Sequence, residues 1–304
     1  MNIKKYISTH AYRVRDPFVT KLNGKYYSVY ALPNKGVGVN VSDTIEGLND
    51  DNGVIAWVPK DNTMHSKENW APELHIINNK CYIYVACDDG NNYNHRMYVL
   101  ENNSNNPLKP YKLHGQIGDD TNRWAIDGTI IQYKNKLFMA WSGWEDEHNV
   151  CQNIYIAEMS DPFTISSKRR MISTPTYDWE KIDCLGLENV KPFVNEGPFS
   201  WIDEKGRLFI IYSASGCWNK GYRLAALLLN GTDPMKDEWI KQDHPFLFTN
   251  EFVSGPGHCS MLKDDDGNYI FFHGWEGNDP STNGNDVYPF YAKFHIEDDE
   301  FIIE

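Results

Sequence analysis

Short apolar stretches alternate with polar turns along this chain, and one arrangement of them occurs five times. Each copy begins with a polar residue beside a small residue or a proline, runs into a short apolar stretch, crosses a turn and ends in an aromatic-rich stretch. The copies cover residues 15–30, 71–85, 126–141, 195–212 and 257–273. Apolar runs of this length, rich in β-branched and aromatic residues, indicate strands, so each copy is predicted to be a β-hairpin.

The predicted turns contain residues that tolerate the positive φ angles of tight hairpins. They are Asn23-Gly24, Asn78-Asn79, Asn135, Lys205-Gly206 and Asp266-Gly267. The turn chemistry therefore agrees with the apolar pattern in all five copies.

The copies recur about every 55 to 70 residues, which leaves room for four strands and their loops. Radial repetition of one all-β unit predicts a five-bladed β-propeller. A β-sandwich with coincidental hairpins is the alternative, but it does not explain why the polar start recurs at the same place. No linker rich in proline, glycine or serine divides the chain, so residues 1–304 are predicted to form a single domain.

The polar residue at each repeat start is expected to face the mouth of the central channel, because the innermost strand of a blade lines that channel. This places Asp16, Glu73, Asp127, Glu196 and His258 around one axis. Taken singly, an acidic residue at a strand end is ordinary turn chemistry, and a lone histidine is more often structural. Gathered carboxylates repel one another, so their recurrence favours a functional site.

Convergent carboxylates suit glycoside hydrolysis, which needs one protonated and one ionised carboxyl across the scissile bond. Asp16 and Glu196 are predicted to face each other at roughly 6.5 to 9.5 Å, which leaves room for a water molecule and implies inversion. An ionised Asp127 beside Glu196 would raise the pKa of Glu196 and could orient it. Glu73 is a candidate substrate-binding residue that holds hydrogen bonds near the funnel.

Aromatic residues make up 14% of the chain, including 10 Trp and 18 Tyr, and they suit both strands and sugar stacking. Trp70, Trp124 and Trp144 lie close to the funnel motifs in sequence. They are candidates for stacking on a sugar ring, and blade packing is the alternative.

Charge and composition exclude several partners. The net charge of −13 comes without a basic stripe, which argues against nucleic acid, while neutral sugars are indifferent to this field. No apolar run approaches the roughly 18 residues of a membrane span. The first ten residues lack the apolar core of a signal peptide, so we expect a cytoplasmic protein or a secreted one whose leader was removed. Six cysteines without C-x-x-C spacing are expected to be free thiols, which favours a reducing compartment.

With these motifs in view, the chain resembles glycoside hydrolase family 43 from about Tyr12 to about Tyr291. The motifs are RDPFV with Asp16, WAPEL at residues 70–74, AIDGT with Asp127, VNEGPF with Glu196 and SGPGH with His258. The resemblance implies a five-bladed propeller with Asp16 as general base, Glu196 as general acid and Asp127 as modulator of the acid's pKa. It implies no required cofactor, and a calcium ion or a water cluster beside His258.

Three further stretches resemble exo-acting α-L-arabinofuranosidases of arabinan: HRMYVLEN at His95, NIYIAEMSDPFTIS at Asn153 and STPTYDWEKI at Ser173. The resemblance implies an inverting hydrolase that releases L-arabinofuranose from a neutral pentose oligo- or polysaccharide. Arg15, where many members have Ala, and residues 277–291 depart from that pattern and leave the specificity open. The alternatives are a β-D-xylosidase or an endo-α-1,5-L-arabinanase of the same family, a non-catalytic sugar-binding propeller and a protein-interaction propeller.

Overall fold

The structure is a computed structural model that describes residues 1–6, 15–32, 35–49, 53–186, 191–277 and 287–304. Tyr12 and residues 278–286, which belong to the resemblance and to one of its departures, lie outside these ranges. Strands dominate the described residues, which contain no α-helix and only three short 3-10 helices, η1 (Glu46–Asn49), η2 (Asn92–Asn94) and η3 (Asp178–Lys181). The predicted all-β class is confirmed.

The strands form antiparallel units that follow chain order. The first sheet contains β2 (Phe18–Leu22), β3 (Lys25–Leu32), β4 (Gly36–Ser42) and β5 (Val54–Trp57). The second sheet contains β6 (Lys67–Ile77), β7 (Lys80–Asp88), β8 (Arg96–Asn102) and β9 (Lys112–Ile117).

A nine-stranded sheet joins two further units. One has β10 (Ala125–Tyr133), β11 (Lys136–Trp144), β12 (Cys151–Asp161), β13 (Thr164–Ile165) and β14 (Arg170–Ser173). The other has β15 (Phe193–Ile202), β16 (Leu208–Ala214), β17 (Arg223–Asn230) and β18 (Glu238–Lys241). Only two parallel residue pairs between β12 and β15 connect these units, so each keeps its own antiparallel order.

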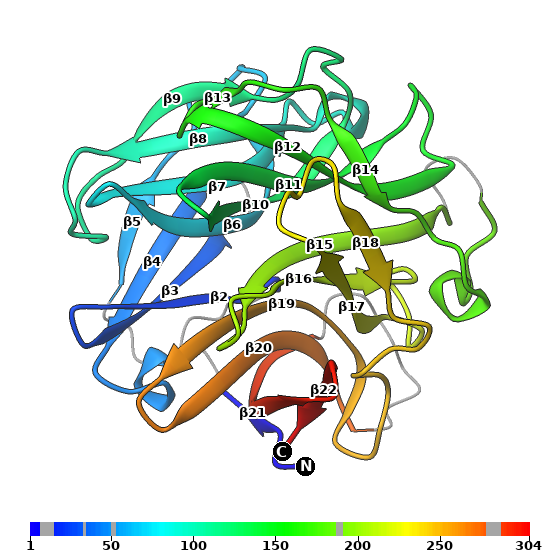
Figure 1. Cartoon of the computed structure of the whole chain (residues 1–304). Coiled ribbons are helices and arrows are strands. Elements are labelled where there is room, and N and C mark those ends of the chain that lie inside the picture. Colours follow the sequence, from blue (N-terminus) through cyan, green and yellow to red (C-terminus); the bar gives the residue numbers. More distant parts are fainter. Residues whose placement is uncertain (7–14, 33–34, 50–52, 187–190, 278–286) are drawn as a thin grey trace.

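The last sheet brings the two ends of the chain together. It contains β19 (Val253–Asp264), β20 (Gly267–Glu276), β21 (Tyr288–Glu297), β22 (Glu300–Ile303) and the N-terminal β1 (Lys4–Lys5). Because β1 pairs with β21, the first strand is held in the last unit, and the N and C ends lie next to each other in Figure 1.

The five predicted hairpins are present as β2–β3, β6–β7, β10–β11, β15–β16 and β19–β20. Their turns use the expected residues, since Asn23 and Gly24 have φ angles of 52° and 77°, and Asn78 and Asn79 have 49° and 62°. Left-handed conformations are accessible to Gly and Asn at low cost, which is why these residues mark the turns.

The first strand of each unit lies nearest the middle of the molecule, and the units follow one another around it in chain order (Figure 1). These inner strands are β2, β6, β10, β15 and β19. Each inner strand contacts the next one in this order, and β19 contacts β2. Residues at the start of the inner strands are therefore brought to one region, whatever their separation in sequence.

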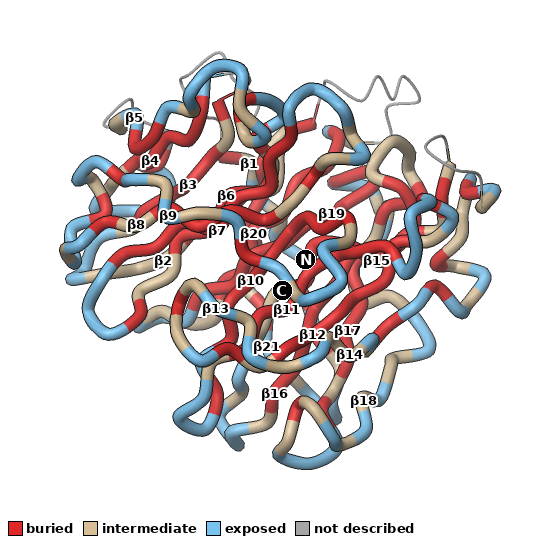
Figure 2. The backbone as a smooth tube through the Cα atoms, turned by 90° about the horizontal axis from the view of Figure 1, so that it is seen from above, coloured by how far each residue is buried: buried red, intermediate tan, exposed pale blue. Residues whose placement is uncertain are grey.

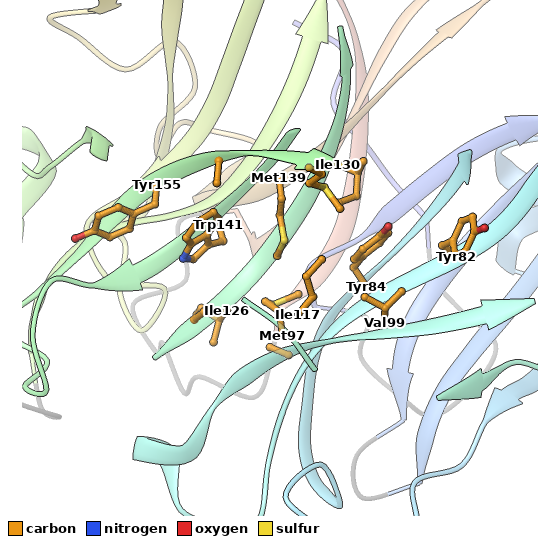
Figure 3. Close-up of a cluster of buried hydrophobic side chains, with 14 of the residues drawn as sticks. Tyr82, Tyr84, Met97, Val99, Ile117, Ile126, Ile130, Met139, Trp141 and Tyr155 are labelled. Atoms are coloured by element: carbon orange, nitrogen blue, oxygen red, sulfur yellow. The ribbon is translucent and has the colours of Figure 1, made fainter. Parts of the chain in front are cut away.

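Packing between neighbouring units makes up much of the core. Buried residues follow the strands, and exposed residues gather in the loops at the edge (Figure 2). Figure 3 shows one such cluster, in which Tyr84 and Met97 from the second sheet face Ile130 and Met139 from β10 and β11. Full burial of side chains of this size contributes about 1.5–3 kcal/mol each.

All six cysteines are free thiols, as predicted. None of the helices within the described ranges is long and apolar enough to cross a membrane.

Candidate active site

A residue with left-handed backbone lies near the start of each inner strand. These residues are Asp16, Ala71, Asp127, Gly197 and His258, with φ angles between 43° and 57°. In four of the five units the strand pairing skips at this residue and resumes two positions later, which is a β-bulge. Bulges at strand ends re-aim side chains, and here they do so beside the middle of the molecule.

The bulges correct the predicted equivalence of the repeat starts. Asp16, Asp127 and His258 occupy the same position of the repeat, as predicted. Glu196 lies one residue earlier, because Gly197 takes the left-handed position of its unit. A side chain on Gly197 would place its Cβ 3.1 Å from the His258 ring, so glycine also permits the close approach.

Glu73 is the second departure. It lies two residues after the left-handed Ala71, where pairing with β7 has resumed. Its carboxylate is buried and lies 2.7 Å from Nε2 of His75. Glu73 is not among the residues that line the cavity and pairs with His75 instead, and its contact with substrate stays a prediction.

A cavity of about 400 Å³ opens at the mouth formed by the inner strands. It is lined by Arg15, Asp16, Trp70, Asn92, Trp124, Ile126, Asp127, Asn149, Gln152, Pro192, Glu196, Cys217, Trp218 and His258. The structure thus brings the three proposed catalytic carboxylates, two of the three tryptophans and His258 into one site. The volume suits a small ligand such as a sugar.

Asp16 sits between two imidazole rings. Its Oδ1 lies 3.2 Å from Nδ1 of His258 and 3.2 Å from Nδ1 of His273, and its backbone N–H donates to Nδ1 of His273 at 3.0 Å. Burial lowers the pKa of His273 to about 4, which fits a neutral ring that accepts this bond. Burial alone would raise the pKa of Asp16, but His258 and the Arg15 guanidinium hold it below its ordinary range. Asp16 is therefore an ionised carboxylate at neutral pH.

Glu196 lies in the opposite electrostatic situation. Burial raises the pKa of Glu196 to about 7. The hydrogen bond with Tyr222 opposes this rise, the negative charge of Asp16 adds to it, and the positive charge of Arg15 opposes it. A carboxyl with this pKa keeps its proton over the acidic range and can donate it near neutrality. One cavity therefore holds a carboxylate and a carboxylic acid.

Asp127 is anchored to the chain next to Glu196. Its Oδ2 accepts a hydrogen bond from the N–H of Gly197 at 3.0 Å. Burial, together with the charges of Glu196 and Asp16, raises the pKa of Asp127 well above its ordinary value. Asp127 thus holds the peptide that follows Glu196, and an orienting role toward Glu196 stays a prediction. The pKa of Glu196 is raised by burial and by Asp16, and the raised pKa of Asp127 does not fit the ionised Asp127 that we predicted as the cause.

Two tryptophans form walls of the cavity with their rear faces covered. The Trp70 ring stacks on His95 at 4.0 Å, and its Nε1 donates to Oε2 of Glu68 at 3.1 Å. The Trp124 ring stacks on Trp144 at 4.7 Å with an interplanar angle of 13°. Trp144 is buried behind Trp124 and does not line the cavity, so the packing alternative holds for it.

Sequence reasoning missed the polar part of the wall. The cavity is also lined by Asn92 on η2, by Gln152 on β12, and by Asn149 and Trp218 in loops, all of which lie outside the repeated hairpins. Only their polar or aromatic character could have suggested them. Arg15, which replaces the Ala of many family members, lies in the wall of the cavity.

The residues around His258 do not resemble a calcium site. Ca²⁺ prefers six to eight oxygen ligands, whereas His258 offers one imidazole, and its Nδ1 already faces Asp16. In the part of the chain that the structure describes, no group of three or more His, Cys, Asp or Glu residues is arranged to hold a metal ion. Calcium at this place stays a prediction, and no reaction step below depends on it.

Comparison with known families identifies one match over nearly the whole chain. The sequence model of the glycosyl hydrolases family 43 matches residues 8–301.

The chain is also similar to individual proteins named arabinofuranosidases. An extracellular exo-α-(1→5)-L-arabinofuranosidase of Streptomyces avermitilis is 30% identical over 83% of this chain and 52% of its own. A protein of the same name from Streptomyces chartreusis is 28% identical over 83% of this chain and 76% of its own. The crystal structure of an α-L-arabinofuranosidase from Lactobacillus brevis superposes with a TM-score of 0.82 and 28% identity, and covers 98% of this chain and 97% of that one. This chain spans about half the length of the Streptomyces avermitilis relative.

Proposed function

The chain belongs to the glycosyl hydrolases of family 43, and from this membership and the site geometry we propose that it is an inverting, exo-acting α-L-arabinofuranosidase. It would release L-arabinofuranose from arabinan or arabino-oligosaccharides. The observation that carries the proposal is a single cavity in which Asp16 is held ionised while the pKa of Glu196 is raised to about 7. The proposed specificity for L-arabinofuranose rests on the similarity to proteins named α-L-arabinofuranosidases.

We further propose that residues 1–304 form one five-bladed propeller, which is the catalytic domain. Five antiparallel units follow one another in chain order, and the inner strands contact each other in sequence from β2 to β19 and back to β2. The pairing of β1 with β21 supports closure, because it ties the beginning of the chain to the last unit.

In the proposed reaction Asp16 removes a proton from a water molecule as the water oxygen attacks the anomeric carbon. The bond from that carbon to the leaving oxygen breaks, and Glu196 gives its proton to this oxygen. Asp127 fixes the peptide that follows Glu196 through the N–H of Gly197. One water is consumed, both sugars leave with complete hydroxyl groups, and the anomeric configuration is inverted.

The cavity wall fits a neutral pentose unit. The cavity-lining rings of Trp70 and Trp124 offer stacking surfaces, and the side chains of Asn92, Asn149 and Gln152 offer hydrogen bonds to hydroxyl groups. A net charge of −13 and the acidic cavity disfavour nucleic acid and other polyanions as partners.

A substrate panel tests the activity. We expect turnover of 4-nitrophenyl α-L-arabinofuranoside to exceed turnover of 4-nitrophenyl β-D-xylopyranoside, and linear arabinan to yield arabinose as the first product in chromatography. Preference for the xyloside would identify a β-D-xylosidase, and early oligosaccharides would identify an endo-arabinanase. Sugar binding without any hydrolysis would identify a non-catalytic propeller and end the proposal.

The role of Glu196 is tested in the same assay. Glu196→Ala should abolish hydrolysis of arabino-oligosaccharides but spare much of the activity on aryl glycosides, because a good leaving group needs little protonation. Glu204→Ala, an exposed glutamate outside the cavity, is the matched control and should behave like the unaltered protein. Undiminished oligosaccharide hydrolysis by Glu196→Ala would refute the assignment.

The compartment and the calcium ion also remain proposals. Both Streptomyces relatives are named as extracellular enzymes, which supports secretion rather than a cytoplasmic location for this chain. If a calcium ion binds beside His258, its removal by a chelator should lower Tm. An unchanged Tm would contradict calcium binding at this place.

A further inference from the structure

A buried polar network lies behind the strand that carries Glu196. At its centre is Glu180 on η3, whose side chain is fully buried. Its Oε1 accepts from Nδ2 of Asn195 at 3.0 Å, from Oη of Tyr212 at 2.9 Å and from Nζ of Lys241 at 2.7 Å. Its Oε2 accepts from the backbone N–H groups of Thr176 and Tyr177 at 2.6 and 2.9 Å. Both carboxylate oxygens are therefore saturated by protein donors.

Asn195 links this network to the cavity. It precedes Glu196 in β15, and successive side chains of a strand point to opposite faces, so Asn195 points into the network while Glu196 lines the cavity. Besides its bond to Glu180, Asn195 accepts at Oδ1 from Oγ of Ser173 at 2.6 Å. Its backbone carbonyl accepts from Oγ of Ser142 at 3.1 Å. Asn195 is completely buried and is held at its amide, its carbonyl and its strand pairing.

The donors come from distant parts of the chain. Ser173 ends β14, Lys241 ends β18, and Glu180 lies on the segment between β14 and β15. This segment is the STPTYDWEKI stretch, which the proposed catalytic carboxylates do not account for. Lys241 also donates to Oδ1 of Asn195 at 3.3 Å. Together with Ser142 on β11, four elements thus converge on the one residue that precedes the proposed acid.

We propose that Glu180 and Asn195 are positioning residues for Glu196: the network fixes the 195–196 peptide so that the carboxyl of Glu196 meets the leaving oxygen. This inference rests on the proposed function. Displacement of a catalytic group by about 1 Å can cost about a hundredfold in rate. A buried ion pair is a weak source of stability, because desolvation offsets most of its attraction, so a role in fixing geometry accounts better for this network.

Leaving-group dependence separates positioning from stability. We would measure kcat for Asn195→Ala on arabinobiose, whose leaving group needs protonation, and on 4-nitrophenyl α-L-arabinofuranoside, whose leaving group does not. We expect the loss on arabinobiose to exceed the loss on the aryl substrate by about tenfold or more. The loss should appear in kcat rather than in KM, because substrate contacts are unchanged.

Asn102→Ala is the matched control. Asn102 is also a buried asparagine at a strand end, with Nδ2 donating to the carbonyls of Asn106 and Lys109 at 2.8 and 3.3 Å, and it does not line the cavity. Both alanine variants should lower Tm, but only Asn195→Ala should make the rate depend on the leaving group. Glu180→Gln keeps the shape of the side chain and should show a smaller effect in the same direction, which covers the case that Asn195→Ala does not fold.

Two outcomes would overturn the inference. Equal losses on both substrates for Asn195→Ala and for Glu180→Gln would show a merely structural network. Leaving-group dependence as large in Asn102→Ala would show a general effect of destabilisation. Glu196→Ala is assayed in parallel, so that failure of the proposed acid is recognised separately from failure of the network.

Discussion

Glu196→Gln should stabilise the protein at alkaline pH, because it removes a carboxyl that is difficult to ionise in the folded state. The pKa of Glu196 is raised from 4.5 to about 7, mainly by burial. Between these values the folded state holds a proton that the unfolded state has released, so the stability of the unaltered protein falls as pH rises through this window. At 1.36 kcal/mol for each pKa unit, the full loss is about 3 kcal/mol.

The assay is urea unfolding of both proteins at pH 5 and pH 8. Glutamine cannot ionise, so the difference in unfolding free energy between variant and unaltered protein should shift by about 2–3 kcal/mol in favour of the variant between the two pH values. Glu204→Gln, an exposed position, should show no such shift. An equal difference at both pH values would show that Glu196 has an ordinary pKa, and the electrostatic basis of the acid would be lost.

Three further outcomes follow from the site. Arg15→Ala removes a positive charge that lowers the pKa of Glu196, so the alkaline limb of the kcat/KM profile should move to higher pH; a downward shift would contradict this placement of the guanidinium. Asp16→Asn should reduce kcat by about 10²–10⁴ on aryl and natural substrates alike, since the attacking water needs the base in both; a loss confined to natural substrates would reassign it. Trp144→Ala should destabilise by about 3–5 kcal/mol in urea unfolding and raise KM, because Trp124 loses the ring behind it; unchanged stability would contradict that packing.

The hairpins were predictable because their signals are local. Apolar runs flanked by turns that contain Gly or Asn define strand pairs without knowledge of distant contacts, and the structure has all five at the predicted places. The joining of two units into one nine-stranded sheet was not predictable. It depends on two parallel residue pairs between β12 and β15, which carry no sequence signal.

The carboxylates of the site were also predictable from local signals, because they lie in the repeat motifs. Their exact register within each strand was not predictable. A bulge shifts the chain by one residue, which turns a side chain to the other face. Glu196 lies one residue before the left-handed position that Asp127 and His258 occupy in their units, whereas Glu73 lies two residues after that position and pairs with His75. The sequence motif contains the acid but does not show where pairing resumes.

The pKa values depend on burial and on groups from other units. The rings that flank Asp16 come from β19 and β20, more than 240 residues later in the chain. Likewise, the side-chain partners of Asn195 come from four other elements, β11, β14, η3 and β18. Such contacts join elements that are far apart in the chain, and no local sequence pattern predicts them.

Proton NMR of the sugar released from an α-L-arabinofuranosyl oligosaccharide tests the central claim most directly. Spectra recorded in the first minutes, before mutarotation, report the anomer that forms at the enzyme. An ionised Asp16 that activates water opposite a protonated Glu196 predicts β-L-arabinofuranose as the first product. First appearance of the α anomer would show retention and contradict the assignment of Asp16 as a base.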